Sequence, residues 1–273
     1  MIPCEEMKLW DGEITKPVVK QYTMSFCMSC MNRLYDLRET LPGNLKRNEP
    51  YPYSNFVLLN YNSQDGLDNW IQDNMREHIE SGRLVYFKMV DPQPKYFNFS
   101  HARNVSLLAA DGEIVNNLDP DNWIYNDKRR KQQDICWAEY LNLLANQQSS
   151  KVIFAKGRRY MHGRWGFYKD EFVNALGGCD EDLFCYEDYD IVIRAWHLGY
   201  TMYWWDGCFG NRIHTGKKER QSGCKDNFFE GARRSMAKSV SNVKNKIFKA
   251  NTGKRWGKAT LIKNFAEEVT IWA

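Results

Sequence analysis

Short apolar runs alternate with longer amphipathic stretches along the first half of the chain. The apolar runs are typical of buried strands and lie at 22–27, 55–61, 84–87 and 114–118. The stretches between them carry apolar residues at helical spacing, and they predict helices at 34–45, 67–79 and 102–110. We expect the first helix to end at Pro42-Gly43. This β-α-β order predicts an α/β protein with a mostly parallel sheet covered by helices.

The second half of the chain is more mixed. Apolar periodicity predicts helices at 134–145, 169–176 and 188–197, and a strand at 152–155. The segment 163–168 leads into the second of these helices, and we find no internal repeat.

Polar clusters follow two of the predicted strands. One begins after Tyr61 and the other after Leu118. Ligands of such sheets bind beyond the carboxyl ends of the strands, so we expect the two clusters to converge on one site.

Composition and charge narrow the class of protein. The chain has 273 residues, which fits one large domain or one domain with an appendage. Its 10 Trp, 15 Tyr and 14 Phe exclude general disorder. The net charge of +4 is unevenly distributed, because residues 1–216 carry 24 basic and 29 acidic side chains whereas 217–263 carry 14 and 3. A slightly acidic body therefore precedes a strongly basic segment, which we expect to be helical.

The start of the chain and its cysteines bear on location. Glu5 and Glu6 stand where a signal peptide would carry basic residues, and no apolar run approaches the roughly 18 residues that span a bilayer. Cys27 and Cys30 form a CxxC, but no second CxxC completes a four-ligand metal site. We interpret them as buried free thiols and expect a cytoplasmic protein, in a bacterium or a virus-infected host.

Two acidic clusters could carry chemistry. Asp119-Pro120-Asp121 projects two carboxylates from one tight turn after a strand, which suits Mg²⁺ or Mn²⁺ and, through it, a diphosphate. The alternative is a solvated turn. Glu187 and Asp188 open a predicted helix, where acids are favoured as caps, or they provide a carboxylate base that deprotonates a hydroxyl.

Taken in order, four blocks of sequence resemble the GT-A nucleotide-sugar glycosyltransferases, especially the family-2-like members. The blocks span residues 22 to about 215: Ser25 to Arg33 with the following Leu-rich helix; Phe56 to Gly66; His101-Ala102-Arg103-Asn104 with the strand that delivers Asp119-Pro120-Asp121; and Gly177 to Glu181 through Glu187-Asp188 to Tyr200. The resemblance implies a GT-A, Rossmann-like fold over 1–216, with a nucleotide-sugar half at about 20–121 and an acceptor half at 122–216. Residues 217–273 would form a basic, mainly helical extension packed on or beside it.

The resemblance also implies roles for individual residues. The donor nucleotide would contact Ser29, Asn32, Arg33, Asn60, Asp65, Arg103, Asn104 and Asp119. Asn60 departs from the family, which normally has an acid there to bind the base, so uridine stays in doubt. Asp65 could equally be a turn residue before Gly66.

The remaining implied roles concern the metal, the base and the acceptor. Asp121, Asp119 and His214 would bind Mn²⁺ or Mg²⁺, and Asp188 would be the base, with Glu187 as neighbour and alternative. Trp165 would stack on an acceptor sugar, although core packing is an alternative for Trp165 and a structural role for His214.

We therefore expect a metal-dependent, inverting glycosyltransferase that moves a hexosyl or pentosyl group from a nucleotide-sugar, most simply a UDP-sugar, to a hydroxyl of a glycan or related acceptor. The basic segment 217–263 leaves three alternatives open: a solvated face, attraction to an anionic acceptor or membrane surface, or DNA whose hydroxymethylated bases are glycosylated, as in some viruses. A non-catalytic relative that binds sugar or nucleic acid is the alternative from another class.

Overall fold

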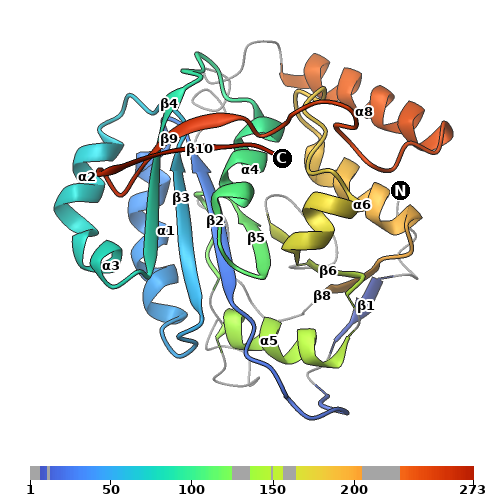
Figure 1. The fold of residues 1–273 in the computed structure, drawn as a ribbon, viewed down its shortest axis with the longest axis horizontal. Coiled ribbons are helices and arrows are strands. Elements are labelled where there is room, and N and C mark those ends of the chain that lie inside the picture. Colours follow the sequence, from blue (N-terminus) through green and yellow to red (C-terminus); the bar gives the residue numbers. More distant parts are fainter. Residues whose placement is uncertain (1–6, 11–12, 125–135, 149, 156–163, 205–227) are drawn as a thin grey trace.

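The computed structural model describes residues 1–273 except 1–6, 11–12, 125–135, 149, 156–163 and 205–227. Its centre is a ten-stranded mixed sheet in the order β1-β8-β6-β7-β5-β2-β3-β4-β9-β10 (Figure 1). Strands β2, β3, β4 and β5 pair in parallel, whereas β7, β9 and β10 run antiparallel to their neighbours. The strands are β1 Met7–Leu9, β2 Met24–Cys30, β3 Ser54–Asn60, β4 Leu84–Asp91, β5 Ile114–Leu118, β6 Val152–Ala155, β7 Arg164–Tyr168, β8 Thr201–Trp204, β9 Ala259–Lys263 and β10 Glu267–Ile271.

Helices cover both faces of this sheet. They are α1 Leu34–Arg47, α2 Leu67–Asn74, α3 Arg76–Glu80, α4 Phe99–Ala109, α5 Trp137–Gln147, α6 Glu187–His197 and α8 Phe228–Lys244, with a π-helical turn at Glu171–Ala175. Buried residues of α1, α2 and α5 form the core on one face, and those of α4 and α6 form the core on the other. The expected α/β architecture, a mostly parallel sheet between helices, is confirmed.

Strand β2 lies at the middle of the sheet and contributes to both cores. Successive side chains of a strand point to opposite faces, so Cys27 and Cys30, three positions apart, belong to different cores. Both thiols are buried and free, as predicted. Burial raises the pKa of Cys27 well above its usual range and that of Cys30 to about 12, which leaves both thiols protonated. They form no metal or redox pair.

One predicted boundary was wrong, and one strand was not predicted. Helix α1 continues through Pro42-Gly43 to Arg47, because Leu41 and Leu45 both pack in the core and this burial outweighs the local break. Residues 164–168 form strand β7, which pairs with β5. Gly166 permits that pairing, since a Cβ there would lie 2.2 Å from Oδ1 of Asn116.

The C-terminal segment departs from the mainly helical expectation. Helix α8 is followed by a hairpin of β9 and β10, and β9 pairs with β4 and so extends the central sheet. Within the described residues, no helix combines the length and apolar character needed to cross a bilayer.

Candidate active site

The carboxyl ends of β2, β3 and β5 lie along one edge of the sheet and bring the predicted acidic and basic residues together. Asp119 and Asp121 follow β5, and Arg33 follows β2. Nη2 of Arg33 lies 3.0 Å from Oδ2 of Asp121, and the same guanidinium donates from Nε to Asp36 across 2.7 Å. The loop after β2 therefore lies directly against the polar cluster that follows β5, because the carboxyl ends of parallel strands meet at one edge of a sheet.

Hydrogen bonds join the loops after β2 and β3 to each other. The amide of Asn32 donates to Oγ of Ser63 across 2.8 Å, and the amide of Gln64 donates to Oδ1 of Asn32 across 2.7 Å. The carboxylate of Asp65 accepts from the amide of Leu34 across 2.7 Å, at the first turn of α1. There it satisfies one of the unpaired amides of the helix start. Asn32 and Asp65 therefore shape the rim of the site.

Two of the residues expected to contact the donor, Asn60 and Ser29, use their side chains in hydrogen bonds within the protein. Nδ2 of Asn60 donates to Asp68 across 2.7 Å and to Tyr86 across 2.9 Å, while its oxygen accepts from the amide of Ser63. Oγ of Ser29 donates to the carbonyl of Ala102 across 2.9 Å. Both residues are buried. In this structure they brace strands β2 and β3, and their contact with a donor nucleotide stays a prediction.

Asn104 is likewise used internally. Its amide donates to the carbonyl of Cys179 across 2.9 Å and to Glu181 across 3.0 Å, and its oxygen accepts from the amide of Cys179. The residue is fully buried and fastens helix α4 to the loop that precedes α6.

Arg103 is the residue that connects the two acidic clusters. Its guanidinium forms ion pairs with both Glu187 and Asp188, and its Nη2 lies 3.3 Å from Oδ1 of Asp119. Burial alone would lower the pKa of Arg103, but the three carboxylates outweigh it and raise that pKa, so the cation is permanent. One buried charge thus holds the turn after β5 against the start of α6.

Glu187 and Asp188 begin helix α6, directly after Tyr186 in a left-handed conformation with φ of 75°. Burial raises the pKa of Glu187; Arg103 opposes this shift, and the Asp188 carboxylate reinforces it. The two adjacent carboxylates thus face one cation, the guanidinium of Arg103.

Trp165 does not occupy the position expected of an acceptor-stacking ring. It is 1% exposed, and its ring contacts Phe167 and Phe172. Its indole Nε1 donates to Oδ1 of Asp188 across 2.6 Å. This burial agrees with the core-packing alternative: β7 directs Trp165 inward, where it orients the carboxylate of Asp188.

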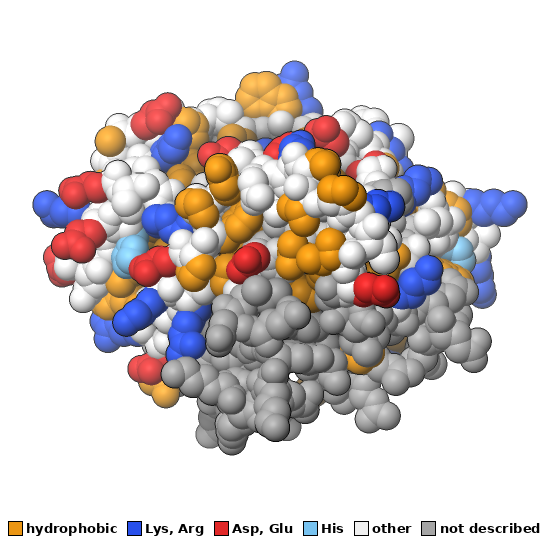
Figure 2. All heavy atoms as spheres, turned by 90° about the horizontal axis from the view of Figure 1, so that it is seen from below, with side chains coloured by type: hydrophobic (Ala, Val, Ile, Leu, Met, Phe, Trp, Pro, Cys, Tyr) orange, Lys and Arg blue, Asp and Glu red, His pale blue; other side chains and the backbone are white. Residues whose placement is uncertain are grey.

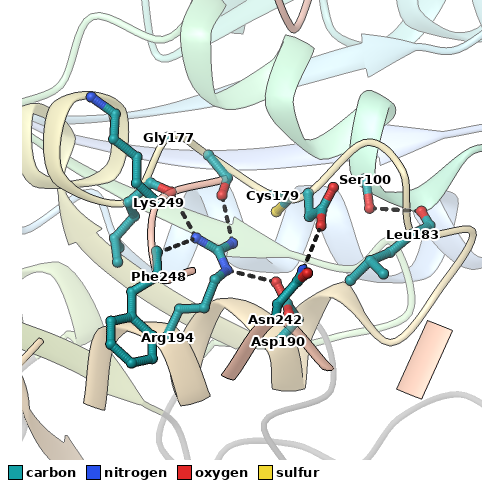
Figure 3. Close-up of polar contacts among 12 residues, drawn as sticks. Ser100, Gly177, Cys179, Leu183, Asp190, Arg194, Asn242, Phe248 and Lys249 are labelled. Carbon is teal, nitrogen blue, oxygen red and sulfur yellow. Dashed lines mark hydrogen bonds and ion pairs between the residues drawn. The ribbon is translucent and has the colours of Figure 1, made fainter. Parts of the chain in front are cut away.

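The loop that leads to Glu187 is held by α6 and by the C-terminal segment (Figure 3). Buried Arg194 donates to Asp190 and to the carbonyls of Leu176, Gly178 and Phe248 over 2.6 to 3.2 Å. Nδ2 of Asn251 donates to the carbonyls of Gly177 and Cys179 across 2.8 and 2.7 Å. The segment after α8 therefore positions the candidate base.

Sequence reasoning assigned no role to Asp36, Arg194 or Asn251. Arg33 and Asp36 stand three residues apart across the start of a helix, and Asp190 and Arg194 four apart, so ion-pair spacing was the signal that could have found the first two. No sequence signal marks Asn251, because its partners lie more than 70 residues away.

The fit to a divalent cation rests on Asp119 and Asp121. Among the described residues, no group of three or more His, Cys, Asp or Glu side chains is arranged to hold a metal, and His214 lies outside them. The side chain of Asp119 is 27% exposed, and Asp121 adds a second hard oxygen donor from the same turn. Mg²⁺-type sites often consist of one or two carboxylates with the remaining positions left to substrate phosphates. The two residues fit such a site.

Comparisons with known proteins agree with the architecture. No protein-family model and no curated protein sequence matches the chain. Solved structures do match, including the mannosyltransferase PcManGT from Pyrobaculum calidifontis in complex with GDP-Man and Mn²⁺, at a TM-score of 0.58 and 19% identity over 77% of this chain. S. aureus TarS 1–349 with UDP-GlcNAc matches at 0.59 and 14% over 82%, and GalNAc-T7 with UDP, GalNAc and Mn²⁺ at 0.58 and 13% over 80%.

The chain has the GT-A fold. The match spans 62% of the mannosyltransferase, 67% of TarS 1–349 and 48% of GalNAc-T7, so this chain corresponds to only part of those proteins. In the GT-A fold described here, the edge that carries Arg33, Arg103, Asp119, Asp121, Glu187 and Asp188 is the candidate active site.

Proposed function

We propose that the chain is a metal-dependent glycosyltransferase that moves a sugar from a nucleoside-diphosphate sugar to a hydroxyl group. The observation that carries the proposal is the position of Arg103, which joins Asp119 on the donor side to Glu187 and Asp188 on the acceptor side. A site for sugar transfer needs charge compensation for a leaving diphosphate and, beside it, a carboxylate for the incoming hydroxyl.

The donor side is supported by charge and by the neighbours of the fold. Those neighbours are complexes with GDP-Man, UDP or UDP-GlcNAc, and two of them contain Mn²⁺. Asp119 and Asp121 supply oxygen donors for such an ion, which would neutralise the negative charge that develops on the leaving diphosphate. The guanidinium of Arg33 borders the same turn and suits a phosphate oxygen. A UDP-sugar is our first choice of donor.

The acceptor side supports a single displacement with inversion. The acceptor oxygen bonds to the anomeric carbon while the bond from that carbon to the diphosphate oxygen breaks, and the hydroxyl proton passes to Asp188. Arg103 and Trp165 both donate to Oδ1 of Asp188, which fixes the carboxylate plane for this role. Glu187, whose pKa is raised by burial, is the alternative proton acceptor.

A donor screen tests the proposal. Purified protein with Mn²⁺ is incubated with UDP-, GDP-, dTDP- and CMP-sugars, and release of the free nucleotide is measured, first in water and then with glycan acceptors or hydroxymethylcytosine DNA. We expect one donor class to be hydrolysed slowly and one acceptor to accelerate release. If the protein binds none of these nucleotide-sugars under the same conditions, the proposed function is wrong.

A further inference from the structure

Helix α8 packs against the body of the protein through small residues. Gly231, Ser235 and Ser239 recur every four residues and are buried. The helix approaches so closely that a Cβ at Gly231 would lie 2.4 Å from the ring of Phe184. Oγ of Ser235 accepts from the amide of Phe184 across 3.1 Å. The buried face of α8 thus needs no large apolar side chain.

Large apolar side chains of α8 point to solvent instead. Phe229 is 72% exposed, and Met236 and Val240 are each 46% exposed. Their spacing of seven and four residues places all three on one face of the helix. Ile247, exposed to a similar degree, follows shortly after the helix ends. This arrangement inverts the usual one, in which a surface helix buries its apolar stripe.

Basic side chains flank the apolar stripe. Residues 228–249 contain six Lys or Arg and one Glu. Arg233 and Lys244 are exposed on the helix, and Lys246 and Lys249 are exposed just beyond it. Lys238 lies apart from them, because it is bonded to Asp182 across 2.8 Å. By contrast, the face in Figure 2 intersperses Lys and Arg with Asp and Glu.

We propose that α8 docks the protein on a bilayer surface that carries anionic lipids, with Phe229, Met236 and Val240 inserted at the headgroup level. An apolar stripe flanked by Lys and Arg is the pattern of helices that lie in the membrane interface. Burial of the stripe among the lipids is favourable, and the basic side chains are attracted to the anionic headgroups. A nucleic-acid partner would explain the basic flanks but not the apolar stripe, because protein–nucleic acid interfaces are polar and would leave the stripe exposed.

The position of α8 gives the docking a consequence. Ser235 contacts the loop that leads to Glu187, and α8 lies at the end of the molecule toward which β2 and β3 run (Figure 1). If the proposed function holds, the docked enzyme meets acceptors that are carried by that membrane. The docking itself does not depend on the reaction.

Vesicle sedimentation with the full chain tests the docking. Large vesicles of phosphatidylcholine with about 30% phosphatidylglycerol are compared with pure phosphatidylcholine at low and high salt. We expect binding to the anionic vesicles, weakened by salt, and about a tenfold smaller partition coefficient for Met236→Ser/Val240→Ser. Ile14→Ser/Val19→Ser is the matched control, because these two side chains are also exposed but lie outside α8; it should bind as the wild type does.

The thermal unfolding transition of each variant shows whether it is folded. Hydrolysis of the sugar donor, measured without vesicles, tests the proposed function independently of the docking. Equal vesicle binding by wild type and stripe variant would overturn the docking. So would binding to duplex DNA in the absence of any vesicle binding.

Discussion

The indole N–H of Trp165 donates to Oδ1 of Asp188 across 2.6 Å, from strand β7 to the first turn of α6. The bond joins two residues that are 23 positions apart in the sequence. Because the ring of Trp165 is enclosed by aromatic neighbours, the bond fixes the carboxylate in one orientation. A base must be held within hydrogen-bond reach of the proton that it removes, and Trp165 performs that positioning here.

Trp165→Phe should keep most of the packing and remove the donor to Asp188. We expect sugar transfer to fall about 10- to 100-fold, the range for one hydrogen bond to a charged group, while donor binding is unchanged. Steady-state transfer and nucleotide-sugar titration are the measurements. The control is Trp70→Phe, which alters a partly buried indole on α2 that packs against the core. A loss of the same size in that variant would indicate that the effect comes from reduced stability.

Asp188→Asn should keep donor binding and lose transfer by about 10²- to 10⁴-fold, because the amide cannot take up the acceptor proton. Product formation at saturating donor is the measurement. Asp182→Asn, an exposed carboxylate in the loop before α6 that is paired with Lys238 and Lys254, serves as the control. Sugar transfer by Asp188→Asn near the wild-type rate would indicate that Glu187, and not Asp188, is the base.

The sequence predicted the framework of the site well. Strand β5 lies at the predicted residues. The polar clusters after β3 and β5, which were predicted to converge, both contact the loop after β2, the first through Ser63 and Asp65 and the second through Asp121. Both follow from apolar periodicity and strand order, which are local signals. The glycosyltransferase resemblance predicted the fold for the same reason, since its first three blocks include the ends of β2, β3 and β5.

The orientation of individual side chains was less predictable. Trp165, Asn60 and Asn104 were assigned to ligands, but tertiary contacts with Asp188, Asp68 and Cys179 occupy them. The hairpin of β9 and β10 was missed because its strands are short and half polar, and β9 is stabilised by pairing with β4. Sequence periodicity cannot indicate which remote partner a side chain finds.

Arg33 should compete with a cation for Asp121. Arg33→Gln removes the guanidinium that lies 3.0 Å from the carboxylate, so we expect Mn²⁺ alone to bind about three- to tenfold more tightly, and UDP to bind more weakly. Electron paramagnetic resonance counts free Mn²⁺, and calorimetry measures UDP. Arg38→Gln removes the same charge from an exposed position on α1. If both variants changed the affinity for Mn²⁺ equally, the contact between Arg33 and Asp121 would not be the cause of the change.

Glu187 should make folding stability depend on pH. Its folded pKa is raised above the ordinary value of 4.5, so the native state binds its proton more tightly than the unfolded chain does. That contribution is present in full below the unfolded pKa and is lost as pH rises toward the folded pKa. In metal-free buffer, the melting temperature of the wild type relative to Glu187→Gln should therefore fall between pH 5 and 8. A difference in melting temperature between the two proteins that stays constant across this range would contradict a raised pKa of Glu187.

Release of nucleoside diphosphate from a nucleotide-sugar, with Mn²⁺ and then with excess EDTA, tests the central claim most directly when wild type and Asp121→Asn are compared. We predict release by the wild type that EDTA abolishes, and a loss of about 10²-fold or more in the variant at the same Mn²⁺ concentration. Equal release by both proteins, or release that EDTA does not affect, would contradict a metal-dependent transferase site at Asp119 and Asp121.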